Sequence, residues 1–135
     1  MSFPSDDMID NFNSRYRASA EPVIRRIEQQ VIGSDYGSTS YTTIAQANLL
    51  RDILDLGPEK RLLDIGTGAG WPGIYLAQSS ECDVVLSDVP FEGLDVARSR
   101  AQTEKTNGSV VASSGAPLPF RDSSFEAVTS SDVFC

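Results

Sequence analysis

The sequence contains no histidine and only two cysteines, Cys82 and Cys135, among its 135 residues. The lack of histidine excludes the commonest general base, the commonest zinc ligand and a Ser-His-Asp triad. Two cysteines alone make neither a disulfide framework nor the spacing of a metal site. We therefore expect two idle thiols, no bound metal and no chemistry that depends on imidazole.

Long apolar runs and basic residues are also scarce. No apolar stretch approaches the roughly 18 residues that cross a bilayer, and the first seven residues are acidic where a signal peptide is basic and then apolar. We therefore expect no membrane association and a cytoplasmic location. Lys and Arg number 11 against 19 Asp and Glu, which gives a net charge of −8. Such a surface repels phosphate backbones, so no nucleic-acid partner is expected.

The remaining composition is that of one globular domain, with 40% hydrophobic and 22% charged residues. Apolar residues at helical spacing predict helices over residues 8–20, 22–32 and 44–54, and Val23, Ile24, Ile27 and Val31 form the apolar stripe of the second one. Beyond residue 60, expected strands alternate with expected helices. The strands span residues 61–65, 83–87, 110–112 and 125–129, and the helices 72–78 and 94–106. This alternation indicates βαβ units and a mostly parallel sheet.

The most informative stretch runs from Asp64 to Gly70 and reads Asp-Ile-Gly-Thr-Gly-Ala-Gly. It follows a strand and opens a helix, where glycines let a ligand approach the backbone and the helix N-terminus offers N–H groups. Asp88 ends the next strand, and an acid there can accept hydrogen bonds from both ribose hydroxyls. The pair predicts a nucleoside-containing ligand at the carboxyl ends of the strands.

Two nucleotide classes fit this pattern. The spacing Gly68-x-Gly70-x-x-Gly73 matches the dinucleotide motif, so an NAD(P)-dependent dehydrogenase domain is the alternative prediction. Asp64, however, would repel a diphosphate and suits a ligand that carries an ammonium group. S-adenosylmethionine has an amino group and a sulfonium but no phosphate, so electrostatics favours it over NAD.

Three motifs in order resemble those of class I S-adenosylmethionine-dependent methyltransferases. They are the Asp64–Gly70 stretch, Asp88, and Leu118-Pro-Phe-Arg-Asp-Ser-Ser-Phe-Glu-Ala-Val128 before the fourth strand. The resemblance implies an α/β fold: a Rossmann-like three-layer α/β/α architecture with a mostly parallel sheet. It divides the chain into a helical N-terminal extension or lid (1–40) and a partial cofactor-binding domain (41–135).

The resemblance also implies a role for each cofactor-binding residue. Asp64 would face the methionine end of the cofactor, and the turn residues would pass beneath it. Asp88 would hold the ribose, and Val89 would pack on the adenine. Ser114 stands where the family commonly has an acid that contacts the adenine amino group. The remaining predicted contacts are Gly66, Thr67, Gly68 and Gly70 of the turn, Gly115 and Ala116 after the third strand, and Tyr41, which either closes over the cofactor or packs in its loop.

Residues 130–134, Ser-Ser-Asp-Val-Phe, lack the Asp/Asn-Pro-Pro-Tyr motif of many nucleic-acid N-methyltransferases. Together with the negative net charge, the lack of this motif favours a small-molecule acceptor. Asp132 either acts on that acceptor, as a base or an orienting group, or is a solvated acid at the end of a strand. Family members continue through three more strands, so we expect a truncated chain that lacks activity alone. A bare fourth-strand edge would then invite self-association. A non-catalytic module that binds cofactor or a partner stays open as well.

Overall fold

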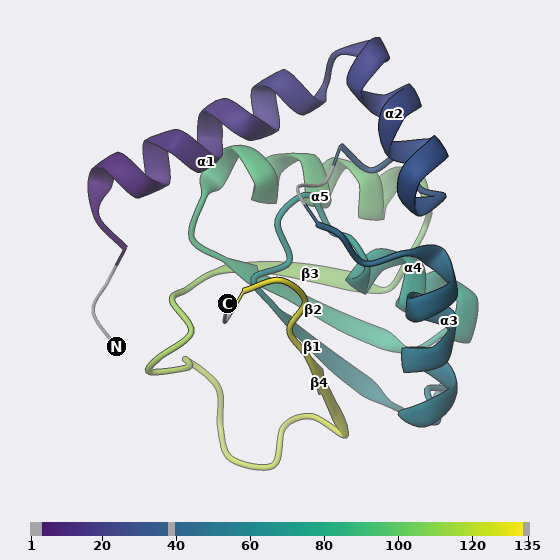
Figure 1. Ribbon diagram of the computed structural model, residues 1–135. Coiled ribbons are helices and arrows are strands. Elements are labelled where there is room, and N and C mark those ends of the chain that lie inside the picture. The colour runs from purple at the N-terminus through teal and green to yellow at the C-terminus, as the bar shows by residue number, and fades with distance from the viewer. Residues whose placement is uncertain (1–3, 38–39, 134–135) are drawn as a thin grey trace.

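The computed structural model describes residues 4–37 and 40–133, and a parallel sheet of four strands lies at its centre (Figure 1). The strands are β1 (Arg61–Ile65), β2 (Asp83–Asp88), β3 (Gly108–Ala112) and β4 (Ala127–Thr129), and their order is β3-β2-β1-β4. Each neighbouring pair runs parallel. The predicted α/β fold with a Rossmann-like parallel sheet is therefore confirmed. The chain reverses its direction of winding between β1 and β4, which is where ligands bind in such sheets.

The inner strands form because their residues are apolar on both faces, as parallel strands require. Leu62 and Leu63 of β1 are both fully buried, and Leu62 pairs with Val84 of β2. The fourth strand is shorter than predicted and begins at residue 127. Phe125, expected in the strand, instead packs edge-to-face on Phe120 at 5.1 Å between ring centroids.

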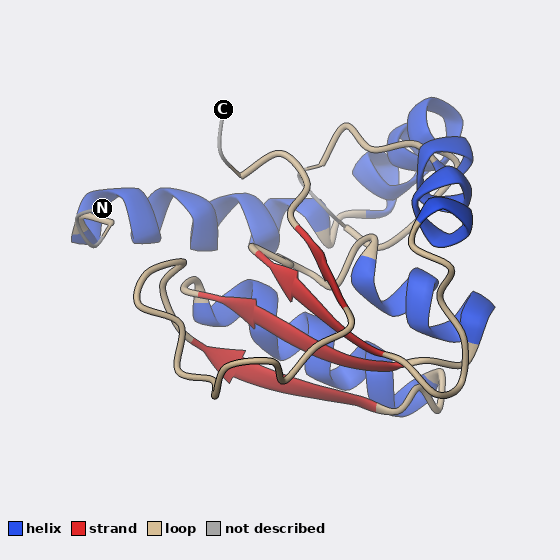
Figure 2. Ribbon diagram, turned by 90° about the horizontal axis from the view of Figure 1, so that it is seen from below, coloured by secondary structure: helices blue, strands red, loops and turns tan. Residues whose placement is uncertain are grey.

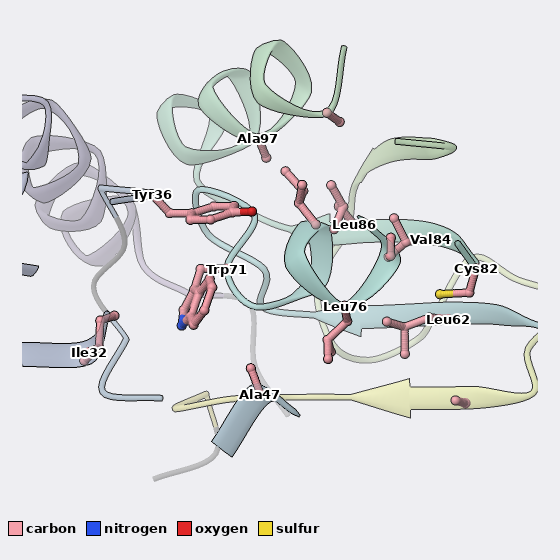
Figure 3. Close-up of a cluster of buried hydrophobic side chains, with 14 residues drawn as sticks. Ile32, Tyr36, Ala47, Leu62, Trp71, Leu76, Cys82, Val84, Leu86 and Ala97 are labelled. Atoms are coloured by element: carbon pink, nitrogen blue, oxygen red, sulfur yellow. The ribbon is translucent and has the colours of Figure 1, made fainter. Parts of the chain in front are cut away.

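Two helices that follow strands cover one face of the sheet. They are α4 (Gly73–Ser80) and α5 (Phe91–Thr103), and the core lies between them and β1 and β2. Figure 3 shows Leu62, Val84 and Leu86 pointing from the sheet into this core. Figure 2 shows these helices behind the strands and the 113–126 connection in front of them. The connection thus runs across the second face of the sheet, and it contains no helix among the described residues.

Three helices precede the sheet, as predicted: α1 (Asp6–Ser19), α2 (Pro22–Ile32) and α3 (Ile44–Ile53). Their ends follow the usual capping rules. The Ser5 hydroxyl accepts from the Met8 N–H, Gly33 ends α2 at φ 82°, and Thr43 and Gln46 form a capping box. Within the described residues, no helix is both long and apolar enough to span a bilayer.

The apolar stripe of α2 lies outward. Val23, Ile24, Ile27 and Val31 are 61%, 41%, 51% and 66% exposed, although such a stripe usually marks a buried face. The loop after this helix is held by hydrogen bonds to one carboxylate of the helix. The Glu28 carboxylate accepts from the Ser34 hydroxyl and from the N–H groups of residues 36 and 37 at 2.7–2.9 Å.

Candidate functional site

A cavity of about 580 Å³ opens at the carboxyl ends of all four strands. Its walls are residues 65–69, 88–90, 113–116 and 131–133, each at or just after the end of a strand, together with residues of α1. This is the position at which open parallel sheets bind ligands. Eight of the predicted contacts line it: Gly66, Thr67, Gly68, Asp88, Val89, Ser114, Gly115 and Ala116.

The glycine turn between β1 and α4 forms the floor of the cavity. Gly66 and Gly68 have φ values of 71° and 56°, which only glycine adopts without strain. The N–H groups of Gly66 and Thr67 both donate to the Ser87 carbonyl at the end of β2, at 2.7 and 3.1 Å. Gly70 does not line the cavity. A Cβ there would overlap Ile74, so this glycine lets the turn pack against α4.

Asp64 lies beneath the turn and is only 1% exposed. One carboxylate oxygen accepts from the Thr67 hydroxyl and the other from the Thr129 hydroxyl, each at 2.7 Å. Burial raises the pKa of Asp64 to about 6. The two hydroxyl donors and the Gly73 N–H favour the charged form and so partly oppose this rise in pKa. The side chain does not line the cavity, although it was expected to face the cofactor. It instead fastens the turn to β4.

Asp88 lines the cavity and holds the other side of the turn. Its carboxylate accepts from the N–H groups of Gly68 and Val89, each at 2.7 Å. Burial raises its pKa, and the two backbone donors oppose that shift. A carboxylate has about four acceptor sites, so Asp88 can also accept from ligand hydroxyls.

The segment after β3 is tied to β2. The Ser113 and Ser87 hydroxyls are 2.8 Å apart and hydrogen-bonded, and the Ser113 N–H donates to the Asp88 carbonyl at 2.9 Å. The Ser114 hydroxyl donates to the Ala116 carbonyl at 3.0 Å. This bond places the Ser114 side chain in the turn that carries the predicted adenine contacts.

Asp132, after β4, organises the loop before α3. Its carboxylate accepts from the Ser40 hydroxyl at 2.6 Å and from the Tyr41 N–H at 2.9 Å. The Ser40 hydroxyl is the main reason why the pKa of Asp132 lies below its usual value. Asp132 lines the cavity, whereas Tyr41 does not and is 82% exposed. The structure thus brings Asp132 into the site and leaves Tyr41 outside it.

Sequence reasoning missed the contribution of α1. Tyr16 is 7% exposed, and a Cβ at Gly68 would overlap its hydroxyl group. The apolar spacing in residues 8–20 predicts the helix but does not show what the helix faces. The cavity residues that α1 and its flank supply are Pro4, Ser5, Met8, Ile9, Phe12 and Tyr16.

Trp71, directly after the turn, connects the cavity to the core. Its indole N–H donates to the Thr42 carbonyl at 2.8 Å, and its ring centroid lies 5.1 Å from that of Tyr36 (Figure 3). The guanidinium of Arg100 lies 3.6 Å from the centroid of the Tyr36 ring. These contacts join the loop before α3 to α5 through the wall of the cavity.

The charges around the cavity decide which nucleotide it fits. Asp88 and Asp132 line it, and no Lys, Arg or His is found among its described lining residues. A diphosphate would meet two carboxylates and no cation, which is unfavourable. A nucleoside that carries a sulfonium and an ammonium group suits this charge.

Comparison with known proteins agrees with this geometry. A family model described as a methyltransferase domain matches residues 62–135. The glycine/sarcosine/dimethylglycine N-methyltransferase of Actinopolyspora halophila is 34% identical over 88 residues, which are 60% of this chain and 15% of that protein.

Among solved structures, the YcgJ protein of Bacillus subtilis is 29% identical, with a TM-score of 0.57 over 62% of this chain and 36% of its own. An S-adenosylmethionine-dependent methyltransferase from Thiobacillus denitrificans, in complex with S-adenosyl-L-homocysteine, is 19% identical, with a TM-score of 0.58 over 65% and 36%. The chain therefore spans about a third of these two proteins.

Proposed function

This chain belongs to the class I S-adenosylmethionine-dependent methyltransferase-domain family, and from that premise we propose that its cavity binds S-adenosylmethionine for methyl transfer to a small molecule. One observation carries the proposal. The glycine turn and the Asp88 carboxylate line a single cavity of about 580 Å³ at the strand ends. A nucleoside fits there with its ribose toward the acid and its charged end over the turn.

Each part of the cofactor has a counterpart in the cavity. Asp88 would accept from the ribose hydroxyls, and Val89 with residues 114–116 would hold the adenine. Gly66 and Gly68 would let the amino-acid end lie close to the backbone. When bound, the cofactor supplies an activated methyl group on its sulfonium. The protein then has to align the acceptor with that methyl group and exclude water, which requires no histidine.

A small-molecule acceptor is supported by the charge of the chain and by the name of a similar protein. The net charge of −8 disfavours nucleic acid. The similar protein from Actinopolyspora halophila is named for small amino-acid acceptors. Ser131, Asp132 and Val133 follow β4 and border the cavity beside the turn, which makes them the residues nearest to a bound acceptor in this proposal. Asp132 already accepts three hydrogen bonds from residues 40–42, so we assign it a positioning role.

Calorimetric titration of the chain tests the cofactor directly. We expect S-adenosylhomocysteine to bind and NAD to produce no heat. Asp88→Asn should weaken binding about tenfold or more, since hydrogen bonds to a charged group contribute about 1.5–3 kcal/mol. Asp122→Asn, which changes an exposed acid outside the cavity, is the matched control. Binding of NAD in preference to S-adenosylhomocysteine would refute the proposal.

A further inference from the structure

We propose that the face of α1 that lines the cavity binds the methyl acceptor, and that this acceptor is a neutral molecule with an apolar body and no carboxylate. This inference rests on the proposed function and narrows its class of acceptor. It gives α1 a binding role in addition to its structural one.

The cavity face of α1 is apolar. Met8, Ile9 and Phe12 line the cavity from adjacent turns of the helix. Met8 is 52% exposed, and Ile9 and Phe12 are half-buried. Neither Ile9 nor Phe12 belongs to the hydrophobic core that the described residues form. The helix therefore presents apolar surface to the cavity, although the core is the usual partner of such a face.

The charged residues of α1 lie away from the cavity. None of them lines it: Asp6, Asp7, Asp10, Arg15 and Arg17. Arg17 Nε lies 3.2 Å from Glu92 Oε1, and the Glu92 N–H donates to Asn13 Oδ1 at 3.2 Å. The polar side of α1 thus attaches the helix to the first turn of α5, and its apolar side faces the cavity.

This helix stands across the cavity from the strand ends. Figure 2 shows the strands pointing toward the helix that follows the N-terminus. The ribose and adenine sites proposed above, at Asp88, Val89 and residues 114–116, lie on the strand side of the cavity. A second molecule can therefore lie against α1. Val133 packs on the glycine turn, since a Cβ at Gly66 would overlap it, so the side proposed for the acceptor is apolar at β4 as well.

Charge disfavours an amino acid as the acceptor in this cavity. Asp88 and Asp132 line it, and no Lys, Arg or His is present among its described lining residues. S-adenosylmethionine carries two cationic groups for its one carboxylate. An amino acid must lose its ammonium proton before its nitrogen can act as a nucleophile, and it then keeps a net negative charge. The two carboxylates of the cavity would repel such an anion.

The N-terminus of α1 does not offset this repulsion. The Ser5 hydroxyl already accepts from the Met8 N–H, and Asp6 and Asp7 occupy the first turn of the helix. Their charges oppose the positive end of the helix dipole, which would otherwise attract an anion. A neutral acceptor avoids the repulsion, and its apolar body is favoured by the apolar wall.

Two ligands that share one ring system test this class of acceptor. 2-Naphthol is neutral at neutral pH, whereas 2-naphthoate carries a carboxylate on the same rings. Calorimetry on the chain saturated with S-adenosylhomocysteine should show that 2-naphthol binds and that 2-naphthoate binds about tenfold or more weakly. Sarcosine, an amino acid in the name of the similar protein from Actinopolyspora halophila, should produce no heat.

Met8→Gln tests the wall itself. Glutamine is an unbranched side chain of similar helix propensity, so the fold is preserved. Its polar end should lower the affinity for 2-naphthol about fivefold, because less apolar surface is buried with the ligand. Ile27→Gln is the matched control, since Ile27 is 51% exposed on α2 and does not line the cavity. We expect this variant to bind 2-naphthol as the wild type does.

Several results would overturn the proposal. They are binding of sarcosine or 2-naphthoate as tight as that of 2-naphthol, no binding of 2-naphthol to the loaded chain, and equal affinity of Met8→Gln and the wild type for 2-naphthol. Displacement of S-adenosylhomocysteine by 2-naphthol would also overturn it, because α1 would then hold the cofactor. A wild type that binds no S-adenosylhomocysteine would instead refute the proposed function, and the first titration shows this before any acceptor probe is added.

Discussion

Replacement of Asp64 by asparagine is expected to make the stability of the protein less dependent on pH between about pH 4 and 7. The pKa of this buried carboxyl is about 6, against an ordinary value of 3.8, because burial disfavours its charged form. Below about pH 4, Asp64 is protonated in both the folded and the unfolded chain and ionisation costs nothing. Between about pH 4 and 6 only the unfolded chain releases its proton, so rising pH favours unfolding.

The size of the effect follows from this difference in pKa. Each pKa unit corresponds to about 1.4 kcal/mol, so ionisation of Asp64 costs the folded state about 3 kcal/mol above pH 7. Asparagine has no charge to bury. The free energy of unfolding of Asp64→Asn, relative to that of the wild type, should therefore rise by about 3 kcal/mol between about pH 4 and neutral pH, in addition to a constant loss from the hydrogen bonds that the amide cannot accept.

Urea unfolding from about pH 4 to 8 measures this difference. Asp122→Asn, at an exposed position, should give a difference that does not change over the same range. If the difference between wild type and Asp64→Asn were constant with pH, the carboxyl would titrate as a solvated group, and its assignment to a dry site beneath the turn would be wrong.

The same substitution should also reduce cofactor affinity, because it changes the hydrogen bonds that hold the turn. The carboxylate accepts from the Thr67 hydroxyl, the Thr129 hydroxyl and the Gly73 N–H. The asparagine amide has a single acceptor oxygen, so at least one of these donors loses its partner and the turn shifts. A weaker pH dependence of stability together with weaker binding of S-adenosylhomocysteine would show that the buried carboxyl is maintained for the site.

Three further predictions concern the turn, the loop after α2 and the edge of the sheet. Gly68→Ala should destabilise the protein by about 1–3 kcal/mol and abolish S-adenosylhomocysteine binding, because φ at Gly68 is 56° and an added Cβ would overlap Tyr16 of α1. Gly57→Ala is the control, since no atom lies within 4 Å of its added Cβ. It should change neither the free energy of unfolding in urea nor the affinity for S-adenosylhomocysteine. Glu28→Ala should cost about 2 kcal/mol in urea unfolding because it removes the acceptor of three hydrogen bonds, whereas Glu21→Ala, whose side chain caps nothing, should not. Val128 is 53% exposed on the outer strand β4, so Val128→Lys should lower the mass that light scattering reports for a self-associated chain; an unchanged mass would argue against association through this edge.

The sequence predicts those parts of the site that can each be recognised within a short stretch of neighbouring residues. The glycine turn and Asp88 each follow a recognisable strand, and the geometry of parallel strands brings their carboxyl ends together. In the structure both line the cavity. Asp64 was placed in the right motif, but its direction depends on which face of β1 it occupies. Thr129, which binds it, comes from a strand 65 residues away.

The two tyrosines show what the sequence leaves out. Tyr41 was chosen because its region often closes over the cofactor, yet it is 82% exposed, while Tyr16 is 7% exposed and lies over the turn. Helical spacing predicts that residues 9, 12 and 16 share a face, but the partner of that face depends on tertiary packing. Gly93 gives no such signal in the sequence, because it lies just before the predicted helix (94–106); only the structure places it within α5, where a Cβ would lie 2.9 Å from the Tyr16 ring.

Three carboxylates explain how an acidic chain without histidine builds an ordered site. Asp64 joins the turn to β4, Asp88 joins it to the end of β2, and Asp132 joins the end of β4 to residues 40–42. Each accepts at least two hydrogen bonds, and among the described residues no buried side-chain nitrogen or oxygen is without a partner. The cavity is thus held in shape before a ligand arrives, which lowers the cost of binding. Asp88 and Asp132 also give the cavity its negative charge, so two of the groups that order the site are those that would suit the cationic cofactor proposed above.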